Sequence, residues 1–418
     1  MEERRVVVTG CGVISCVGND VPSFWDSLVN GRCGIGPITR FDAGAYRTRI
    51  AGEVKNFDMS AHLNVKDARR MDLFTQYAIV AAEEALRSAG LPANPEEKRT
   101  DGDRFGCMVS SGVGGLATMD REDVVLNTRG PDRVSPFLIP MMISDMAAGA
   151  VSIRYDLRGP NVGLVSACAT GCHSIGEAFW TIKHDDADLM LAGGAEASVV
   201  PLGLAGFCAL KALSTRNDDP QHASRPFDRD RDGFVMSEGA GVIVMEELGH
   251  AVRRGAPILA EVVGYGATAD AYHITSPAPD GSGAARAMLM AMRHAGITPD
   301  ELDYVNAHGT STSLNDKFET AALKLALGDA ARRVAISSTK GTTGHALGAA
   351  GGLECIACIQ SIRTGIVPPT INYENPDPEC DLNYTPNTAV RREVRYAMNC
   401  NLGFGGHNGT MLFKKFEG

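Results

Sequence analysis

The chain has 418 residues, of which 44% are hydrophobic and 22% charged, and its formal net charge is −10. These values are typical of a globular protein with an ample core, built as two or three domains or as one large duplicated α/β body. The acidic balance argues against general binding to nucleic acid or to anionic membranes. No apolar run approaches the ~20 residues of a membrane-spanning helix. A strand begins at once, over Arg5–Thr9, which leaves no room for a signal peptide and predicts a cytoplasmic protein without membrane insertion.

The cysteines predict a reducing compartment. There are eleven of them, an odd number scattered along the chain, so free thiols are expected rather than disulfides. Cys355 and Cys358 have the spacing of half a zinc site, but they lie in an apolar, helical stretch and no second pair stands at ligand spacing. We interpret them as buried core thiols, and the sequence predicts no metal site.

The first strand, Val6–Thr9, is followed by Gly10-Cys-Gly12, which imitates the start of a dinucleotide-binding fingerprint. Ser15 stands where the third glycine belongs, and the next helix is delayed to Asp20 and Pro22, which supply a cap and a first-turn proline. A tight turn therefore explains the glycines better than a bound nucleotide does.

An amphipathic helix is predicted from Met71 to about Gly90. Lys66, Arg69 and Arg70 form a basic group just before it, in an otherwise acidic chain. These charges are either a solvated helix start or a docking point for an acidic partner.

Residues 113–145 interrupt the alternation of strands and helices. They follow a predicted strand at Phe105–Val109 and contain Pro131, Pro136 and Pro140, so we predict a cap over the body. A helix from Met141 to Ile153 is expected next.

The stretch Val162–Ala178 has the pattern of a strand, a sharp turn and a helix, with Cys168 at the turn. This is the geometry of a nucleophile elbow, although the G-x-S-x-G signature is absent. A helix N-terminus lowers the pKa of a thiol, so Cys168 is expected to be partly thiolate near neutral pH. Taken alone, the stretch is more typical of a small buried cysteine.

A second stretch, Ser337–Ala350, aligns with the first without a gap at a spacing of 172 residues. The alignment pairs Cys168 with Lys340 and His173 with His345, and four further positions also match. We interpret it as an internal duplication whose two copies carry different chemistry.

The β/α pattern continues to the end of the chain and restarts near residue 257. Strands and helices are predicted in turn at Leu189–Gly194, Val242–Met245, Leu259–Gly264, Gly283–Ala295, Tyr304–Ala307 and Asp316–Leu327. Thr215–Phe234 is expected to be a charged, solvated loop. The sequence therefore predicts two halves, residues 1–256 and 257–418, with parallel or mixed sheets covered by helices.

Chemistry-bearing residues gather in the second half. His308 directly follows a strand, at the edge where sites collect in α/β folds. His345 lies in the second copy of the repeat, and Leu402–Asn408 is a glycine-rich turn that can present backbone N–H groups. A thiol, two imidazoles, a lysine and such a turn can form one catalytic site.

These motifs resemble those of the β-ketoacyl-acyl-carrier-protein synthases of the thiolase superfamily, specifically the synthase II type of fatty-acid elongation. The resemblance covers nearly the whole chain, through the segments Val6–Gly10, Gly159-Pro160, Ser166–Thr170, Ala192–Glu196, Leu213–Asn217, Arg231–Phe234, Asn306–Thr312, Thr339-Lys340 and Gly403–Gly406. It implies an α/β protein with the thiolase-like, duplicated, five-layer α-β-α-β-α fold, and a homodimer.

The resemblance also implies roles for single residues. Cys168 would accept an acyl group from an acyl carrier protein as a thioester, with the amides of Cys168 and Phe404 as the oxyanion hole. His308 and His345 would donate to the malonyl thioester carbonyl as carbon dioxide leaves. Lys340 would hold this arrangement, and Phe404 would be the gate between the acyl and malonyl pockets.

Supporting roles follow in the same way. The network around Lys340 would comprise Asp316, Glu319 and Glu354. Thr310 and Thr312 would contact the pantetheine arm, and the acyl pocket would include Val113 and Leu138. The basic patch for the acidic carrier would comprise Lys66, Arg69, Arg70 and Lys211. No resident cofactor is implied, because 4′-phosphopantetheine arrives on the carrier substrate.

The sequence departs from the family in a few places. Cys400-Asn401-Leu402 stands where Asn-Ser-Phe is usual, and His407 stands where threonine is common. Val113 and Leu138 are smaller than the Ile and Phe often found there, which leaves chain-length preference open.

Other readings also stay open. A polyketide ketosynthase would share every catalytic residue, and an inactive dimeric binding module would not acylate Cys168. A cysteine hydrolase is disfavoured, because two neutral imidazole donors with a lysine suit decarboxylation better than activation of water.

Overall fold

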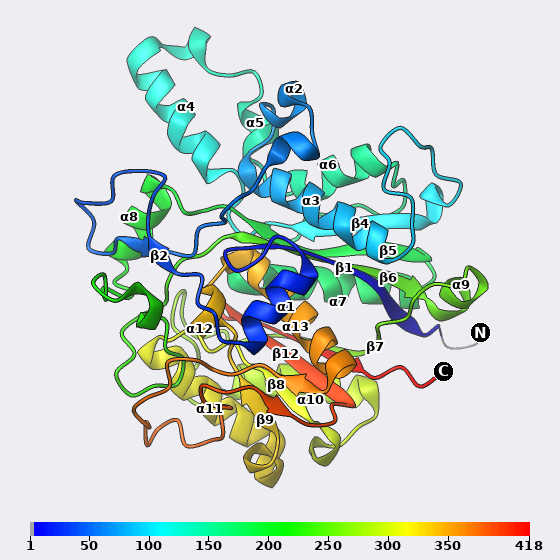
Figure 1. Cartoon of the computed structure of the whole chain (residues 1–418), viewed down its shortest axis with the longest axis vertical. Coiled ribbons are helices and arrows are strands. Elements are labelled where there is room, and N and C mark those ends of the chain that lie inside the picture. The colour runs from blue at the N-terminus through cyan, green and yellow to red at the C-terminus, as the bar shows by residue number, and fades with distance from the viewer. Residues whose placement is uncertain (1–3) are drawn as a thin grey trace.

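A computed structural model describes residues 4–418, whose strands form a nine-stranded sheet bent around two central helices (Figure 1). The strand order is β4 (Phe105–Ser110), β5 (Leu189–Glu196), β6 (Gly239–Glu247), β1 (Val6–Ser15), β7 (Ala260–Ala269), β13 (His407–Lys414), β12 (Tyr396–Gly403), β8 (Tyr304–Asn306) and β9 (Ala335–Ser337). Strands β1 and β7 pair over three residues, from Val6 to Val8. The sheet is therefore two half-sheets joined at a short seam.

Helices complete five layers around the two half-sheets (Figure 1). The outer layer on the β4-β5-β6-β1 half contains α3 (Leu73–Ser88) and α6 (Met146–Tyr155). The central layer, between the half-sheets, contains α7 (Thr170–Lys183) and α13 (Ala350–Thr364). The far layer contains α10 (Ser282–Ala295) and α11 (Ser313–Leu327). The predicted five-layer α/β fold is confirmed.

Strand β5 shows how the sequence builds this arrangement. Leu189 and Leu191 face the core under α3 and α6, whereas Met190 and Ala192 face the central core around α7 and α13. Successive side chains of a strand point to opposite faces, so a strand covered on both faces is a continuous apolar run.

The two halves repeat one topology. In the first half, Asn161 bridges in parallel to Cys107 of β4, β4 and β5 are parallel, and β5, β6 and β1 run antiparallel to their neighbours. In the second half, β9, β8 and β12 are parallel, and β12, β13 and β7 alternate in the same way. The predicted duplication is present in the fold.

The predicted register of that duplication is wrong. A 3₁₀ turn, η4 (Ala167–Ala169), precedes α7, and a matching turn, η8 (Leu347–Ala349), precedes α13. Their first residues share a strained backbone, with φ of 51° at Ala167 and 49° at Leu347. Cys168 therefore corresponds to Gly348, 180 residues later.

The 172-residue alignment fails because the second segment is longer. Ala167 comes six residues after the bridge at Asn161, whereas Leu347 comes ten residues after Ser337, the end of β9. The longer segment contains α12 (Lys340–Thr343). Small residues are frequent in both stretches, so the two sequences align well at a spacing of 172 although those positions do not correspond in the fold. In the first half, the expected strand before Cys168 is reduced to its single bridge.

Two glycines allow the central helices to cross closely. A Cβ on Gly171 would lie 2.9 Å from the amide nitrogen of Gly352, and a Cβ on Gly351 would lie 2.3 Å from that of Cys172. The contacts are reciprocal, as expected for residues 180 apart that are related by the duplication. The same contacts bring the two turns η4 and η8 together.

The glycines near the N-terminus have another role than the one predicted. Gly10 and Gly12 lie within β1 and not in a turn. A Cβ on either would lie about 2 Å from a carbonyl oxygen of α3, 2.1 Å from that of Ala85 or 1.9 Å from that of Ala81. They let α3 pack directly on the strand. The predicted cap at Asp20 is confirmed, since its side chain accepts from the amide of Ser23 at 2.7 Å before α1 (Val21–Val29).

The segment predicted as a cap forms α4 (Leu116–Arg129), η3 (Pro131–Arg133) and α5 (Leu138–Met142). Together with α2 (Val65–Ala68) it projects at the top of Figure 1. Apolar side chains on it are exposed, Val124 by 57% and Ile139 by 58%. The segment thus carries an uncovered apolar surface.

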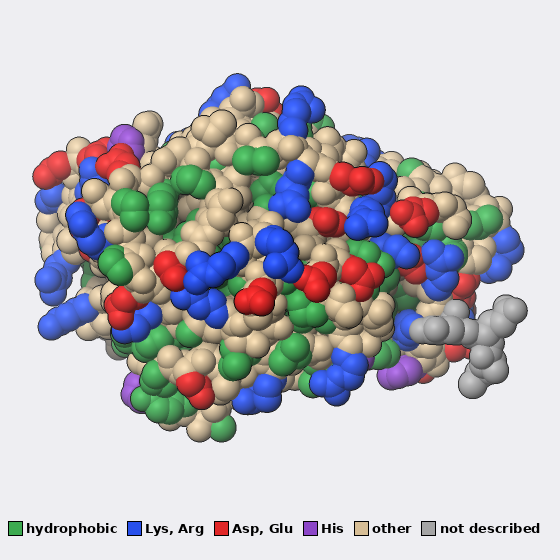
Figure 2. All heavy atoms as spheres, turned by 90° about the horizontal axis from the view of Figure 1, so that it is seen from below, with side chains coloured by type: hydrophobic (Ala, Val, Ile, Leu, Met, Phe, Trp, Pro, Cys, Tyr) green, Lys and Arg blue, Asp and Glu red, His purple; other side chains and the backbone are tan. Residues whose placement is uncertain are grey.

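The remaining elements are short or peripheral. They are β2 (Gly36–Pro37), β3 (Ile50–Ala51), η1 (Met59–Ala61), η2 (Gly102–Arg104), α8 (Pro201–Ala209), η5 (Pro220–His222), α9 (Leu248–Arg253), η6 (Pro299–Glu301), η7 (Gly328–Arg332), β10 (Ile366–Val367) and β11 (Val390–Arg391). The lower face of the molecule interleaves basic with acidic side chains and has no large patch of one sign (Figure 2). Over residues 4–418, every helix is too short or too polar to cross a bilayer.

Candidate active site

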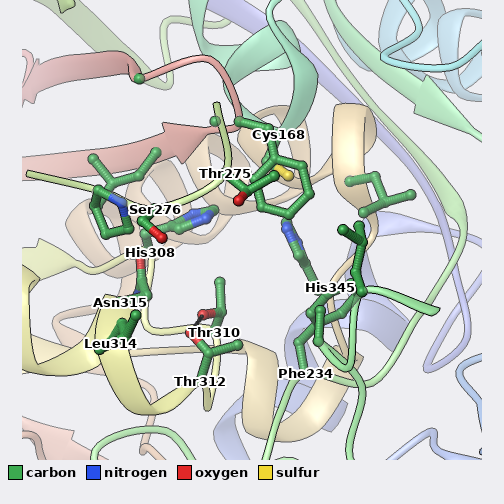
Figure 3. Close-up of a pocket in the computed structure, with 18 of the residues that line it drawn as sticks. Cys168, Phe234, Thr275, Ser276, His308, Thr310, Thr312, Leu314, Asn315 and His345 are labelled. Carbon is green, nitrogen blue, oxygen red and sulfur yellow. Dashed lines mark hydrogen bonds between the residues drawn. The ribbon is translucent and has the colours of Figure 1, made fainter. Parts of the chain in front are cut away.

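A cavity of about 240 Å³ opens where the two half-sheets and the two elbows meet. Cys168, His308 and His345 line it together (Figure 3). They come from η4, from the loop after β8 and from the loop before η8. Figure 3 shows both imidazoles directed toward the region of the Cys168 sulfur, with Thr310 and Thr312 across the cavity. The duplication thus brings the predicted groups to one place.

The thiol of Cys168 is not the expected thiolate. Burial raises its pKa to about 12, and the charges of Glu196 and Glu354 raise it further, while Lys340 lowers it. The helix-terminus prediction is wrong here, because desolvation of the thiolate outweighs both the elbow and the one nearby cation. Cys168 is 9% exposed, so its sulfur meets the cavity as a neutral thiol.

The two imidazoles are buried and neutral. Their ring centroids are 5.1 Å apart and the rings are nearly perpendicular, at 87°. Burial holds the pKa of His308 and of His345 well below 6.5, and the Lys340 charge lowers both further. Nδ1 of each ring is buried without a partner, which leaves Nε2 as the nitrogen available to a ligand.

A buried carboxylate holds the loop that carries His308. Glu319 of α11 accepts from the amides of His308, at 2.6 Å, and Gly309, at 2.7 Å. Ser338 fixes the same loop from the other side, donating to the carbonyl of Gly309 at 2.7 Å. Burial raises the pKa of Glu319 to about 7.

Lys340 forms a buried ion pair with Glu354 of α13. Asn401 donates to the other oxygen of Glu354 at 2.7 Å, and Asn399 donates to Asn401 at 2.8 Å. Asp316, expected in the same network, instead lies beside Arg231 at 3.7 Å and accepts from the amide of Phe227. Of the three predicted partners of Lys340, the structure thus places Glu354 in direct contact.

The glycine-rich turn between β12 and β13 lies against the elbow. A Cβ on Gly403 would be 2.4 Å from the carbonyl oxygen of Ser166 and 3.3 Å from the amide nitrogen of Cys168. Phe404 lines the cavity, and its ring lies 6.5 Å from that of Phe207. The turn thus brings Phe404 to the cavity beside Cys168.

The other predicted residues are distributed differently. Thr310 and Thr312 line the cavity, with their hydroxyls 2.9 Å apart. Val113 and Leu138 are not among the lining residues, and Val113 is 42% exposed. Their place in an acyl pocket stays a prediction.

The predicted carrier-docking residues fall into two groups. Lys211 lies between Leu210 and Ala212, which both line the cavity. Lys66, Arg69 and Arg70 lie on or just after α2, with Arg70 over the ring of Phe137 at 4.7 Å. Of the four predicted docking residues, Lys211 is the one that lies beside the cavity of its own chain.

Sequence reasoning missed several residues of this site. Phe234 packs edge-on against His345 at 5.3 Å. Asn408 donates to Asp270 at 2.7 Å, and both line the cavity. Asn408 closes the glycine-rich turn and Phe234 ends the segment Arg231–Phe234, both of which the sequence had singled out without giving these two residues a role, whereas no local pattern marks Asp270.

Fold and site together define a condensing enzyme of the thiolase-like class. The chain belongs to the beta-ketoacyl synthase family, since residues 3–251 match the family's N-terminal domain and residues 259–374 its C-terminal domain. The boundary predicted at residues 256/257 stays a prediction.

Curated relatives match over the whole chain. A 3-oxoacyl-[acyl-carrier-protein] synthase 2 from Synechocystis is 50% identical, covering 100% of this chain and 99% of the relative. The protein of the same name from Staphylococcus aureus is 52% identical with the same coverage.

Solved structures agree. A beta-ketoacyl synthase from Burkholderia phymatum superposes with a TM-score of 0.92 at 35% identity, covering 99% of this chain and 100% of that one. A type II PKS ketosynthase solved in complex with its acyl-carrier protein gives a TM-score of 0.91 at 34% identity, covering all of both chains.

Proposed function

We propose that this chain is a 3-oxoacyl-[acyl-carrier-protein] synthase of the synthase II type, which extends an acyl chain by two carbons through decarboxylative condensation with a malonyl unit. The observation that carries the proposal is one buried cavity that holds Cys168 with two neutral imidazoles, His308 and His345. The identity of about half the residues to curated enzymes of this name supports it.

The first half-reaction loads the acyl group. The Cys168 sulfur attacks the thioester carbonyl of the incoming acyl carrier, and its proton passes to the neutral imidazole of His345 as the carbon–sulfur bond forms. The amides of Cys168 and Phe404 stabilise the negative oxygen of the tetrahedral intermediate. Collapse releases the pantetheine thiolate, which takes the proton from the imidazolium. A thiol with a pKa raised to about 12 requires such a base.

The second half-reaction forms the carbon–carbon bond. The neutral imidazoles of His308 and His345 donate from Nε2 to the malonyl thioester oxygen. They thereby stabilise the enolate that forms when the bond to the malonyl carboxylate breaks and carbon dioxide leaves. The enolate carbon attacks the acyl carbonyl on Cys168, the bond from that carbon to the Cys168 sulfur breaks, and the thiolate that leaves takes a proton from solvent. Protonated imidazoles would not be needed, which agrees with the depressed pKa of both rings.

The acyl and malonyl groups reach the cavity on the pantetheine arm of an acyl carrier protein, so no resident cofactor is required. Thr310 and Thr312 offer hydroxyls to the arm from the cavity wall. Phe404, on the turn between β12 and β13, would gate the passage from the acyl to the malonyl pocket. A related ketosynthase was solved with its acyl-carrier protein.

A polyketide ketosynthase is the second candidate, because structural relatives include one. The identity to that chain is 34%, against 52% to a curated synthase 2. A ketosynthase would accept β-ketoacyl primers, whereas a fatty-acid enzyme would turn over saturated acyl primers faster.

The same proposal includes a homodimer. The edge of the first half-sheet ends in the segment 161–166, which is tied to β4 by one bridge and leaves Val162 and Val165 exposed by 45% and 59%. An uncovered apolar strand edge is expected to pair with a second copy. Light scattering of the purified chain should give twice the monomer mass, and Val165→Lys should shift it toward the monomer.

The deciding experiment is intact-mass spectrometry with acyl carriers of graded chain length. The wild-type chain should gain one acyl group, and Cys168→Ala should gain none. Addition of malonyl carrier should then yield a 3-oxoacyl product two carbons longer. A folded wild-type chain that acylates but never condenses would contradict the proposal.

A further inference from the structure

The duplication relates the last residues of β5 and β12. Glu196, the last residue of β5, pairs with Gly239 of β6, which pairs with Ser15, the last residue of β1. Gly403, the last residue of β12, pairs with His407 of β13, which pairs in the same way with Ala269, the last residue of β7. Glu196 therefore stands in the first half where Gly403 stands in the second.

Gly403 keeps the first elbow open. A Cβ at this position would lie 3.3 Å from the amide nitrogen of Cys168. Any longer side chain would cover the amide that the proposed function uses as an oxyanion donor. The backbone of Gly403 is not in the left-handed region, so its conformation does not require glycine. The close neighbouring atoms do, because they leave no room for a side chain.

Glu196 fills the corresponding place at the second elbow. Its Oε2 accepts from the amides of Gly348 and Gly112, both at 3.1 Å. Its Oε1 accepts from the hydroxyls of Ser111 and Ser198, both at 3.0 Å. The carboxylate is fully buried, and Gly348 is the residue that corresponds to Cys168.

We propose that Glu196 is a positioning residue whose carboxylate occupies, beside Gly348, the place that the substrate oxyanion takes beside Cys168. The inference rests on the proposed function for the oxyanion role of the Cys168 amide. The second elbow thus keeps its anion site, and the protein fills it from within.

This carboxylate joins the two segments that carry the reacting groups. Gly112 lies against Ala167, since a Cβ on Gly112 would be 3.0 Å from the carbonyl oxygen of Ala167, next to Cys168. Gly348 follows His345 by three residues. By holding Gly112 and Gly348 on one oxygen, Glu196 fixes the thiol relative to the imidazole of His345.

Two substitutions test the proposal. Glu196→Gln can keep all four hydrogen bonds, because its carbonyl oxygen can face the two amides and its NH₂ the two hydroxyls, which can rotate to accept. Glu196→Ala leaves all four donors without a partner. The Gln variant should retain most of the condensation rate, and the Ala variant should lose about tenfold or more.

Chemical rescue then tests the acceptor at this site. Sodium formate should enter the space left in Glu196→Ala and restore condensation, and formamide, which offers the same carbonyl acceptor as the Gln variant, should restore it as well. Wild-type condensation by the Ala variant, or no restoration by either molecule in a folded Ala variant, would overturn the proposal.

A second readout does not depend on the Ala variant folding. Burial is the main cause of the raised pKa of the Cys168 thiol; Lys340 lowers this pKa, and the charges of Glu196 and Glu354 raise it further. Alkylation of Cys168 by iodoacetamide, followed by intact mass against a Cys168→Ala control, should be faster in Glu196→Gln than in wild type above pH 7. Identical rates in the folded variant would overturn the proposal. The alkylation result stands whether or not the wild-type chain condenses, so it separates this inference from the proposed function.

Discussion

The two elbows share a backbone and differ in what they carry. η4 with α7, and η8 with α13, have the same turn, the same positive φ at their first residue and reciprocal glycine contacts. The first has Cys168, open to a cavity, and the second has Gly348, covered by Glu196. The difference lies in the residue at the end of the neighbouring strand, since Gly403 leaves the amide of Cys168 uncovered and Glu196 accepts from the amide of Gly348.

The largest expected effect comes from making the first elbow like the second. Cys168→Gly should abolish acyl transfer and condensation completely, because no nucleophile remains. It should leave decarboxylation of malonyl carrier, since His308 and His345 are untouched. Release of carbon dioxide and intact mass measure the two steps separately. Loss of decarboxylation in a folded Cys168→Gly chain would reject the division of labour between thiol and imidazoles.

The next largest effect is expected from removing one imidazole while Cys168 stays in place. His308→Ala should leave acylation of Cys168 largely intact and lower condensation by about 10²–10⁴-fold, the range for loss of a positioned proton donor. Single-turnover acylation and steady-state condensation should therefore diverge. His294→Ala, on α10 and outside the cavity lining, is the matched control. A His308→Ala chain that cannot be acylated would mean that the ring also serves the first half-reaction.

Much of this comparison could be predicted from the sequence. The alternation of apolar strands and amphipathic helices predicts the layers, the end of a predicted strand marks His308, and the run of glycines marks the turn at Phe404. The register of the repeat could not be predicted, because α12 and its loop lengthen the second segment and only the pairing of β9 with β8 reveals it. The prediction of a tight turn at Gly10 and Gly12 was wrong for a similar reason, since the helix that packs on these glycines is distant in sequence.

Electrostatics was the other limit. The position of Cys168 at a turn favours a thiolate when only the chain around it is considered. Its pKa depends on burial and on Glu196, Glu354 and Lys340, which come from other elements. Desolvation of a group is a property of the packed molecule, and sequence spacing does not contain it.

The neutrality of the imidazoles predicts an unusual pH profile. Because burial holds the pKa of both rings well below 6.5, they remain neutral as the pH falls through the range where an exposed histidine is protonated. Decarboxylation by Cys168→Gly should therefore stay level from about pH 8 to about pH 6. A decline centred near the ordinary histidine pKa would show that at least one ring is solvated.

The same shift sets the sign of a stability effect. Below pH 6.5 the unfolded chain binds protons at His308 and His345 that the native rings do not bind. The contribution of the two rings to the free energy of unfolding should therefore decrease as the pH falls below this value, whereas the buried carboxyls of Glu196 and Glu319, whose pKa is raised to about 7, contribute in the opposite direction. Urea unfolding of wild type and of a histidine-to-glutamine variant across this range isolates the contribution of one ring, as the difference between the two slopes.

A smaller effect concerns acyl chain length. Val113 follows Gly112, which lies against the elbow, and the resemblance to the family predicts that Val113 lines the acyl pocket. Each buried methylene of an acyl chain contributes ~0.8 kcal/mol, so we expect long primers to be accepted and Val113→Phe to shorten the range. Competition between primers of graded length, read by intact mass, measures it. An unchanged length profile would place Val113 outside the acyl pocket.

The smallest expected effect concerns docking of the acyl carrier protein. The chain carries a net charge of −10, and an acyl carrier protein is also acidic, so encounter needs a local basic surface. Lys211 lies beside the cavity, and Arg69 lies on the projecting segment around α2. Single surface ion pairs contribute ~0–1 kcal/mol, and steering is screened over ~8 Å at physiological salt. Charge reversal at Lys211 and Arg69 should therefore raise KM for carrier substrates several-fold without changing turnover of a short pantetheine thioester, because steering acts on association.

Arg391→Glu, on β11 and outside the cavity lining, is the control. Wild-type kcat/KM with the carrier should also decrease as salt rises. Equal losses on carrier and surrogate would assign these cations to the fold instead of to docking.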